Sequence, residues 1–400
     1  MLPAMECHLE CEPGFAPSIA AMVSCVEGRY IPNKPSEFSC NPAAAIIVTS
    51  EGEVETFSGE PICNKIITNI PPHVSTSQTV NVFKNHLVIV GYSVGEGTWN
   101  YLSLEDPISS LLSNPWTVST TVGELTPQSH TSFSHGRSLI LIGGSQESAL
   151  KMDVDTLGGN WNSFSLQWSN GTNFTRFTSS GCGVRVTKNN YLIIGGINIK
   201  TKEVTSNIVN IDIKNMVVHE LPGLRVGRAL HACEVVDRTT ILVTGGRTAV
   251  DDGPGNIAPD EKYNLTTEIS SYSNKSMVIP RYNHRLVLLG DTVFAIGGRM
   301  ANKSEVNQVE RYSSDTSSWE VLSDGLLSHS TGDLAVATIA RSSLDCDVGC
   351  SCGVGQEAGG DTRVGGFGCE AQVTVISIHK VLCCTGELIP MDWTYSCGYY

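Results

Sequence analysis

The fold is indicated most clearly by residues 285–323, RLVLLGDTVFAIGGRMANKSEVNQVERYSSDTSSWEVLS. Two apolar runs, RLVLLG and TVFAIGG, flank a turn at Gly290-Asp291, QVERYS then alternates polar and apolar residues, and SWEVLS completes the series. The almost wholly apolar second run indicates a strand covered on both faces. Gly297 and Gly298 let the chain leave that strand at backbone angles that other residues resist. The stretch therefore predicts a unit of four short strands.

The apolar run that ends in glycine returns at a nearly fixed interval. Its copies are HLVIVGY, LILIGGS, YLIIGGI, ILVTGGR and VFAIGGR, which reach their first glycine at Gly91, Gly143, Gly195, Gly245 and Gly297. The intervals are 52, 52, 50 and 52 residues. In the last four copies a second glycine follows, at Gly144, Gly196, Gly246 and Gly298. A period near 50 residues that contains short strands indicates a propeller blade or a solenoid unit.

Two aromatic residues complete the repeat pattern. Tyr312 and Trp319 follow the double glycine, and we expect them to pack between neighbouring blades because large aromatics suit a wedge-shaped gap. The double glycine, the segment ERYSSDTSSW and the preceding RYNH (281–284) or RALH (228–231) together resemble a kelch repeat. The likeness covers roughly residues 43–343. It implies a β-propeller that binds proteins through its loops.

Both ends of the repeat region predict strands that lack a complete unit. GDLAVATIARSS, from Gly332, predicts a first strand, AAAIIVTSEGEVETFSG, from Ala43, a second and a third, and CNKIITNIP, from Cys63, a fourth. Joining them completes a sixth blade and removes the exposed edges of an open array. We therefore expect an all-β fold, a six-bladed kelch-like β-propeller over residues 42–344.

Cysteines and glycosylation sequons both point to the secretory pathway. No CxxC pair is present, which argues against a zinc ribbon. Cys182 and Cys233 hold nearly equivalent places in adjacent units, so we predict a disulfide between blades. The fourteen disulfide candidates are Cys7, Cys11, Cys25, Cys40, Cys63, Cys182, Cys233, Cys346, Cys350, Cys352, Cys369, Cys383, Cys384 and Cys397. The five glycosylation candidates are Asn170, Asn173, Asn264, Asn274 and Asn302. We expect a secreted, extracellular glycoprotein.

Residues 1–41 form a cysteine-rich segment. CEPGF (11–15), Cys25, GRY (28–30) and Cys40 resemble the latter part of a sushi (complement control protein) module. The resemblance implies a Cys11–Cys40 disulfide, with Cys7 and Cys25 either paired to each other or left without upstream partners. The opening strands of the module and a secretion leader are both absent from the sequence. We therefore expect a mature product or a piece of a longer precursor.

Residues 345–400 form a second segment rich in cysteine and glycine. QVTVISIHKVLCC within it predicts one β-strand. Its seven cysteines are an odd set, so one is expected to pair outside it, with Cys63 as a candidate. The strand VTVISIH has no evident sheet of its own, and such a strand can add to the edge of another molecule. Self-assembly into a matrix or filament through the terminal segments is therefore an alternative function.

Charge and hydropathy exclude two classes of partner. The formal net charge of −14 argues against nucleic acid and against anionic membrane surfaces, because both attract Lys and Arg. No run approaches eighteen apolar residues, so we expect no membrane insertion. A protein partner, with a second copy of the chain as one option, remains.

Metal chemistry is the less favoured interpretation. Galactose oxidase has kelch-type blades, and its copper site needs two imidazoles and two tyrosines that converge. His130, His231, His284 and His329 instead share one phase of the repeat, which favours a structural role. SSDTSSW lacks the glycine of a sialidase aspartate box. The loop VDDGPGNIAPDE, with Asp251, Asp252, Asp260 and Glu261, could hold a structural calcium ion, although an ordinary solvated insertion is favoured.

These features favour a non-catalytic interaction or adhesion protein without a cofactor. We expect it to bind partners through the loops that follow each double glycine, above all Arg247–Glu261 and Arg299–Asn307, since loops vary over a constant scaffold. The two alternatives are a self-assembling extracellular subunit and a galactose-oxidase-like copper enzyme.

Overall fold

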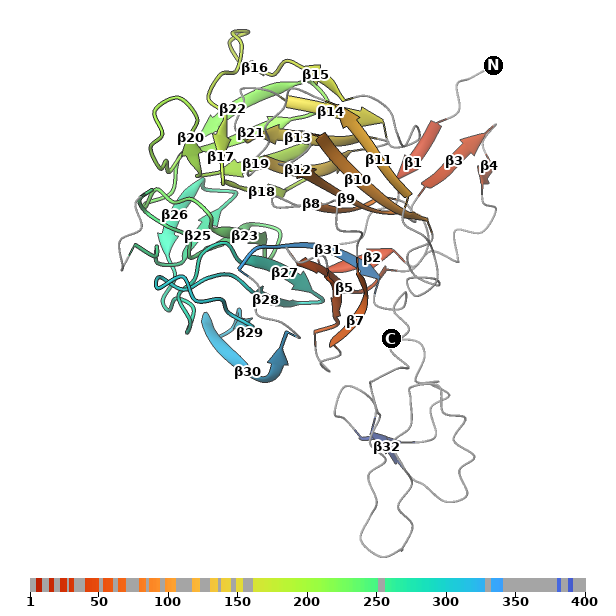
Figure 1. Cartoon of the computed structure of the whole chain (residues 1–400), viewed down its shortest axis with the longest axis vertical. Coiled ribbons are helices and arrows are strands. Elements are labelled where there is room, and N and C mark those ends of the chain that lie inside the picture. The colour runs from red at the N-terminus through yellow and green to blue at the C-terminus, as the bar shows by residue number, and fades with distance from the viewer. Residues whose placement is uncertain are drawn as a thin grey trace, which may run out of the picture.

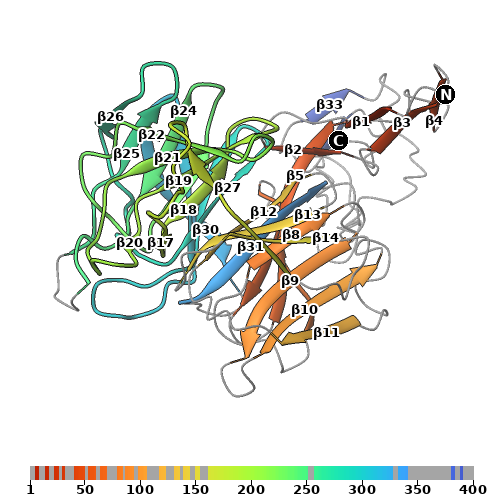
Figure 2. The same ribbon diagram turned by 90° about the horizontal axis from the view of Figure 1, so that it is seen from above.

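The computed structural model shows an all-β propeller in which sheets are arranged around a common centre (Figures 1 and 2). Its description covers residues 5–8, 14–17, 22–26, 29–31, 40–49, 53–59, 64–69, 79–83, 86–93, 98–105, 117–122, 130–135, 138–144, 149–153, 161–250, 256–327, 332–340, 380–382 and 388–390. Within this described part, no helix is long and apolar enough to cross a membrane.

Residues 285–326 form one blade. Strands β27 (Arg285–Leu289), β28 (Thr292–Ile296), β29 (Gln308–Ser313) and β30 (Ser318–Leu326) pair in order as an antiparallel sheet. Tyr312 lies opposite Trp319, with ring centroids 5.0 Å apart. Both rings belong to one buried apolar cluster with Ala232 and Leu242 of the preceding blade. The predicted strands and the packing of aromatics between blades are confirmed.

Each of four more blades has four strands that pair in their order along the chain. They are β8–β11 (Thr79–Phe83, His86–Ser93, Thr98–Glu105, Thr117–Val122), β12–β15 (His130–His135, Ser138–Gly143, Ala149–Asp153, Asn162–Phe164), β18, β19, β21 and β22 (Cys182–Arg185, Asn190–Ile194, Ile208–Asp212, Val217–Leu221), and β23–β26 (Ala232–Val235, Thr240–Thr244, Glu261–Asn264, Ile269–Tyr272). The short β16 (Gln167–Trp168) pairs in parallel with β22, and β17 (Thr178–Ser179) pairs with β20 (Ile197–Asn198). The first strands of neighbouring blades contact each other, so they line the centre.

One further sheet is composite, because it joins the two ends of the repeat region. Strand β31 (Leu334–Ala340) pairs with β5 (Cys40–Thr49), which is followed by β6 (Glu53–Phe57) and β7 (Asn64–Asn69). It lies between the blades of β8 and β27, since β31 contacts both strands. The expected pairing of the two ends is therefore present.

The expectation of a six-bladed propeller is wrong, because the structure shows five blades, each of strands that pair in their order along the chain. The composite sheet departs from these blades by taking a further strand. Strand β2 (Phe15–Pro17) pairs with residues 40–42 of β5, so that β5 carries β2 and β31 along its length. The chain segment ahead of the repeat thus contributes to a propeller sheet, which the repeat period could not reveal.

The expected boundary between residues 41 and 42 falls inside β5. Gly14 joins the N-terminal segment to the propeller, because its carbonyl oxygen accepts hydrogen bonds from Ala43 N (2.9 Å) and Gly290 N (2.8 Å). Strands β1 (Met5–His8), β3 (Met22–Val26) and β4 (Arg29–Ile31) form a separate three-stranded sheet. The resemblance to a sushi module remains an expectation, and the side chains of its four cysteines lie outside the described residues.

Little of the C-terminal segment is described. Strands β32 (Lys380–Leu382) and β33 (Leu388–Pro390) form an antiparallel pair. The seven cysteines of this segment, Cys63 and the whole of VTVISIH (373–379) lie outside the described residues.

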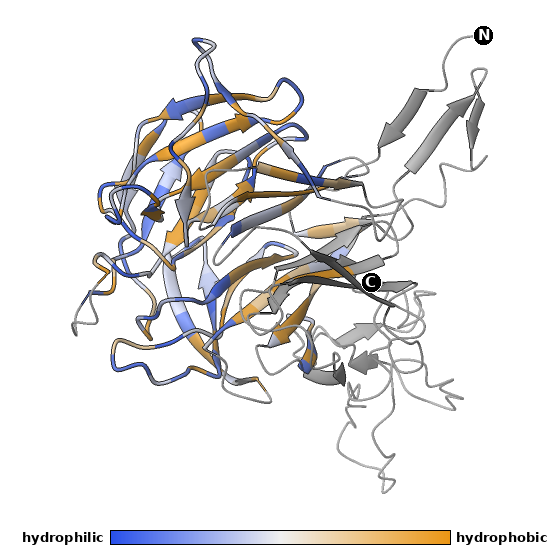
Figure 3. Ribbon diagram, turned by 45° about the horizontal axis from the view of Figure 1, so that its top comes forward, coloured by the Kyte–Doolittle hydropathy of each residue, from blue (hydrophilic) through white to orange (hydrophobic). Residues whose placement is uncertain are grey.

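The apolar core lies between the sheets. Figure 3 shows apolar residues mainly along the strands of the described blades. In β19, β24 and β28 the last four residues of each strand are buried, because a neighbouring sheet covers each face. This confirms the interpretation of the apolar runs.

Candidate functional site

The double glycines gather at one end of the propeller, which we call the glycine face and define by Gly143–Gly144, Gly195–Gly196, Gly245–Gly246 and Gly297–Gly298. All eight have positive φ, as predicted. Gly144 N donates to Thr178 O (3.3 Å), Gly196 N to Arg228 O (2.8 Å) and Gly246 N to Arg281 O (3.1 Å). The second glycine of each of these blades therefore holds the segment that leads into the next blade.

A buried arginine lies beneath this face in two successive blades. Arg281 donates from Nη2 to Glu310 Oε1 (2.5 Å) and from Nη1 to Gly297 O (3.1 Å), and both side chains of the ion pair are fully buried. Arg228 makes the same contacts one blade earlier, to Glu261 Oε1 and to Gly245 O. Each ion pair links the segment just before the first strand of a blade with the third strand of the same blade.

The two glutamates also hold the preceding loops. Glu261 accepts hydrogen bonds from Arg225 N (2.8 Å) and Val226 N (3.1 Å), and Glu310 accepts them from Val278 N (2.7 Å) and Ile279 N (3.0 Å). This role of Glu261 and Glu310 was not predicted from the sequence, although the repeated pattern EKY (261–263) and ERY (310–312) was an available signal.

Three of the four histidines that hold the same position in successive repeats lie in the interior. His231 and His284 are buried, and His284 Nε2 lies 2.7 Å from Thr244 Oγ1. Burial, and then the charge of Arg228, lowers the pKa of His231 to about 3, while burial lowers the pKa of His284 well below its usual range. His130 is also buried, and His329 lies outside the described residues. Among the described residues, no group of three or more His, Cys, Asp or Glu side chains is placed to hold a metal ion.

Two acidic residues considered as calcium ligands, Asp260 and Glu261, lie in the interior. Asp260 is buried and accepts hydrogen bonds from Gly245 N (3.2 Å), Met277 N (3.0 Å) and Trp319 Nε1 (2.9 Å). Burial raises its pKa to about 6. Glu261 is engaged with Arg228 in the same interior. Asp260 therefore stabilises the contact between two blades, and Glu261 holds the segment ahead of the first strand of its own blade. The favoured expectation, a solvated insertion, would leave both side chains exposed; Asp251 and Asp252 lie outside the described residues.

A disulfide joins two neighbouring blades. Cys182 of β18 and Cys233 of β23 are bonded, with their Cα atoms 5.9 Å apart and a sequence separation of 51. The prediction from their equivalent places in adjacent units is confirmed. Four of the five sequon asparagines are exposed (Asn170, Asn173, Asn274 and Asn302), and Asn264 is partly exposed.

The surface of the glycine face presents arginines at a repeated place. Arg247 and Arg299 each follow the second glycine of a blade. Arg247 exchanges two backbone hydrogen bonds with Ala229 (2.8 and 2.9 Å), and Arg299 does the same with Tyr282 (2.8 and 2.9 Å). Both side chains are partly exposed. The fold therefore holds these two cations in equivalent positions of neighbouring blades.

The surroundings of the two arginines differ. The guanidinium carbon of Arg247 lies 5.2 Å from the ring centroid of Tyr282, a cation–π arrangement. Arg299 forms ion pairs with Glu305 (2.7 Å) and Asp333 (3.4 Å). Asn283 also donates to Asp333 and to Gly332 O, which connects this blade to the composite sheet.

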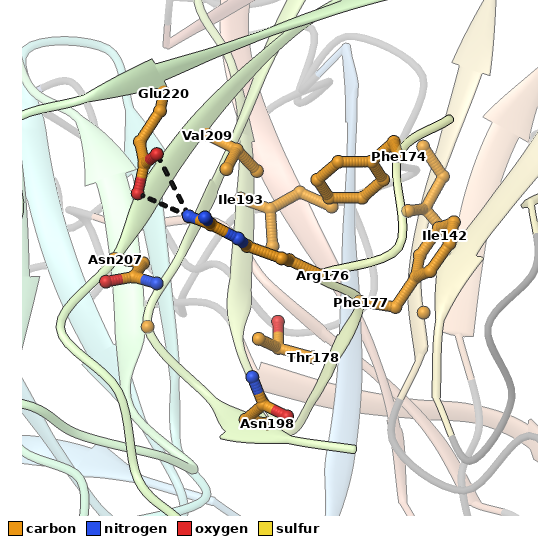
Figure 4. Close-up of a pocket in the computed structure, with 12 residues that line it drawn as sticks. Ile142, Phe174, Arg176, Phe177, Thr178, Ile193, Asn198, Asn207, Val209 and Glu220 are labelled. Carbon is orange, nitrogen blue, oxygen red and sulfur yellow. Dashed lines mark hydrogen bonds and ion pairs between the residues drawn. The ribbon is translucent and has the colours of Figure 1, made fainter. Parts of the chain in front are cut away.

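A cleft opens on the same face between the blades of β13 and β19 (Figure 4). Arg176 extends through its centre and donates from Nη1 to both carboxylate oxygens of Glu220, each at 3.0 Å. The guanidinium carbon lies 5.2 Å from the ring centroid of Trp168. The remaining wall combines apolar side chains with polar ones: Ile142, Phe174, Phe177, Ile193, Val209, Thr178, Asn198 and Asn207.

Comparisons with known proteins agree with this architecture. The profile described as "Kelch motif" matches residues 280–325, which include the blade of β27–β30. A solved structure titled "Structure of YjhT" superposes with a TM-score of 0.55 at 12% identity, covering 70% of this chain and 95% of the other, and therefore shows the fold alone. No curated protein matches the chain. The β-propeller fold is shown by the arrangement of sheets, and the kelch motif in one blade supports a propeller of kelch repeats.

Proposed function

We propose that the protein is an extracellular, non-catalytic binding protein that holds an acidic segment of a partner protein on the glycine face. A kelch propeller is commonly a scaffold for protein interaction. The observation that carries the proposal is the repeated placement of Arg247 and Arg299, each held by the same pair of backbone hydrogen bonds. These bonds fix the backbone of both arginines, while the Tyr282 ring holds the guanidinium of Arg247 and two carboxylates hold that of Arg299. Such ordering before a partner arrives lowers the entropic cost of binding.

The charges on this face suit a carboxylate ligand. Arginine forms bidentate hydrogen bonds with carboxylates. The pair of Arg176 with Glu220 is about half exposed, and Arg299 is paired with the partly exposed Glu305 and Asp333. Exposed pairs contribute only about 0–1 kcal/mol each, so an incoming carboxylate competes with them at low cost. Because the chain carries a net charge of −14, acidic segments are repelled by most of its surface and attracted only where arginines gather.

The extracellular part of the proposal is supported by the Cys182–Cys233 disulfide and by the exposed sequons. Structural disulfides persist in oxidising compartments and are rare in the cytosol. Intact mass of native material, measured with and without reductant and glycosidase, tests this part. Fully reduced, sugar-free protein would contradict it.

The binding part is tested with two labelled peptides. One contains four glutamates within a mixed sequence, and the other has glutamine at those positions. We expect fluorescence anisotropy to show tighter binding of the glutamate peptide, with affinity falling as salt increases. The double variant Arg247→Ala/Arg299→Ala should lose most of this preference.

Arg311→Ala is the matched control, because Arg311 lies on β29 and pairs with Glu320 away from the glycine face. It should leave binding unchanged. Equal affinity for the two peptides, or an equal loss in the control variant, would contradict the binding proposal without affecting the assignment to the outside of the cell.

A further inference from the structure

The outer strand β26 exposes apolar side chains at the margin of its blade. Four large apolar residues in the described part of the chain are highly exposed: Val250, Ile269, Tyr272 and Val278. Ile269 is the most exposed of them, at 62%, and Tyr272 is 49% exposed; both lie on β26. An exposed outer strand with apolar side chains is a site at which sheets of different molecules can pair.

Two other outer strands, β22 and β30, are covered or polar. β16 pairs with the outer side of β22. On β30, Glu320 and Ser323 are the exposed residues among those whose side chains are described. On β26, Arg225 covers the end near Tyr272, since its Nε donates to Ser270 O (3.1 Å) and its guanidinium lies 5.3 Å from the Tyr272 ring. Within the described residues, no comparable contact covers Ile269.

Two sequons flank this strand. Asn264, in Asn-Leu-Thr, lies directly opposite Ile269 in the antiparallel register, and Asn274, in Asn-Lys-Ser, follows two residues after the strand ends. Directly opposite residues project from the same face of a sheet, with Cβ atoms about 5 Å apart. A sugar attached to Asn264 would therefore emerge beside Ile269.

The side chain of Asn264 is positioned for this attachment. Its Oδ1 accepts hydrogen bonds from Thr266 N (2.9 Å), Thr267 N (2.8 Å) and Thr267 Oγ1 (3.1 Å). These bonds hold the carboxamide through its oxygen, so that Nδ2, the atom that takes a sugar, is outside the turn. Asn264 is partly exposed and Asn274 is exposed.

We propose that N-linked glycans on Asn264 and Asn274 cover the outer edge of β26, with the Asn264 glycan lying over Ile269. The proposal rests on the extracellular part of the proposed function, because the transfer occurs in the secretory pathway. The glycan is bulky and solubilising, and it blocks the approach of another strand to this edge.

The modification is an oligosaccharyl transfer from a lipid-linked oligosaccharide diphosphate. The asparagine Nδ2 forms a bond with C1 of the first sugar while the bond between C1 and the diphosphate oxygen breaks. One Nδ2 proton goes to a base of the transferase, and the lipid diphosphate leaves. No oxidant or reductant takes part.

The test uses the full chain secreted from a eukaryotic cell behind a cleavable leader, so that passage through the pathway is imposed. Glycopeptide mapping should show sugars on Asn264 and Asn274. The variant Thr266→Ala removes the first sequon but keeps Asn264 and its hydrogen bond from residue 266, and Asn274→Gln removes the second. We expect the double variant to lose both glycans and to aggregate several-fold faster by light scattering, at an unchanged melting temperature.

Two further variants identify the cause. Adding Ile269→Thr to the double variant should restore slow aggregation, because the exposed apolar side chain is then gone. Asn302→Gln, which removes a sequon on another loop, should leave aggregation unchanged. Unmodified Asn264 in the secreted protein, or an aggregation rate in the double variant equal to that of the wild type, would overturn the proposal. Failure of the acidic peptide to bind, or retention of the native chain inside the cell, would overturn the proposed function instead.

Discussion

Arg281 donates to Glu310 at 2.5 Å in the interior of the propeller, and neither side chain is exposed. The carbonyl oxygen of Arg281 accepts a hydrogen bond from Gly246 N of the preceding blade (3.1 Å). One residue therefore connects the charge network of its own blade to the glycine turn of its neighbour. The same arrangement links Arg228 to Glu261 and to Gly196 N. The glycine face is held in place by these buried contacts.

Replacing Glu310 with glutamine should destabilise the fold by about 3–5 kcal/mol, because it leaves the buried charge of Arg281 without its partner. Urea unfolding at neutral pH measures the change. Arg311 lies on the same strand as Glu310 and forms a more exposed ion pair with Glu320 of β30. Arg311→Ala breaks this pair and should change the free energy of unfolding by about 1 kcal/mol or less. Similar losses in the two variants would show that the buried pair has no special weight.

Removing the disulfide with Cys182→Ala/Cys233→Ala should lower the free energy of unfolding by about 2–4 kcal/mol, because the bond restricts the unfolded chain across a separation of 51 residues. Thermal unfolding with and without reductant provides the measurement. The wild type should respond to reductant more strongly than the double variant does. An identical response would contradict a stabilising role for this bond.

Gly246→Ala should destabilise the protein far more than Gly171→Ala. The two glycines have nearly the same φ, +82° and +81°, so both substitutions cost about 1–2 kcal/mol for an alanine in this conformation. A Cβ on Gly246 would lie 2.5 Å from His231 Cβ, whereas a Cβ on Gly171 would meet nothing within 4 Å. Chemical denaturation of the two variants separates steric conflict from backbone strain. Equal losses would show that the interior can adjust around residue 246.

Stability should fall as the pH decreases from about 6.5 toward 3, in part because of His231. Its folded pKa of about 3 lies below the usual value of 6.5, so in this window the unfolded chain binds a proton that the folded chain does not. Burial raises the pKa of Glu234 to about 7 and that of Asp260 to about 6, and these groups oppose the trend. The contribution of His231 is therefore the difference between the wild type and His231→Gln.

That difference should shrink steadily as the pH is lowered, because the wild type alone loses the stability that depends on a neutral His231. The free energy of unfolding at several pH values gives the measurement. His219→Gln, at an exposed position of β22, is the control for the replacement of a histidine by glutamine. A difference that does not vary between pH 7 and 4 would contradict the assignment.

Features that recur within each unit were predictable from the chain. The double glycines require a positive φ wherever they occur, and Tyr312 opposite Trp319 follows from the length of the turn between their strands. The Cys182–Cys233 bond was predictable because residues at the same phase of adjacent units lie side by side in a ring. A single local pattern, repeated, sets each of these features.

The buried acidic residues were not predictable in the same way. Asp260 and Glu261 lie in a polar segment that resembles a solvated loop in sequence. Trp319, 59 residues further on, donates to Asp260, and Arg228 pairs with Glu261. Only the packing of blades brings these donors together, and this packing places Asp260 and Glu261 in the interior where a solvated loop was expected.

The repeat, its period and the strands of each unit could be predicted from the sequence, because local periodicity and glycine backbone preferences act within about fifty residues. Three contacts became evident only in the folded chain: the pairing of β2 with β5, the burial of Arg281 with Glu310, and the position of Asn264 beside Ile269. These are contacts between segments whose registers depend on how the sheets pack, and the free energy of that packing is spread over many side chains of both partners.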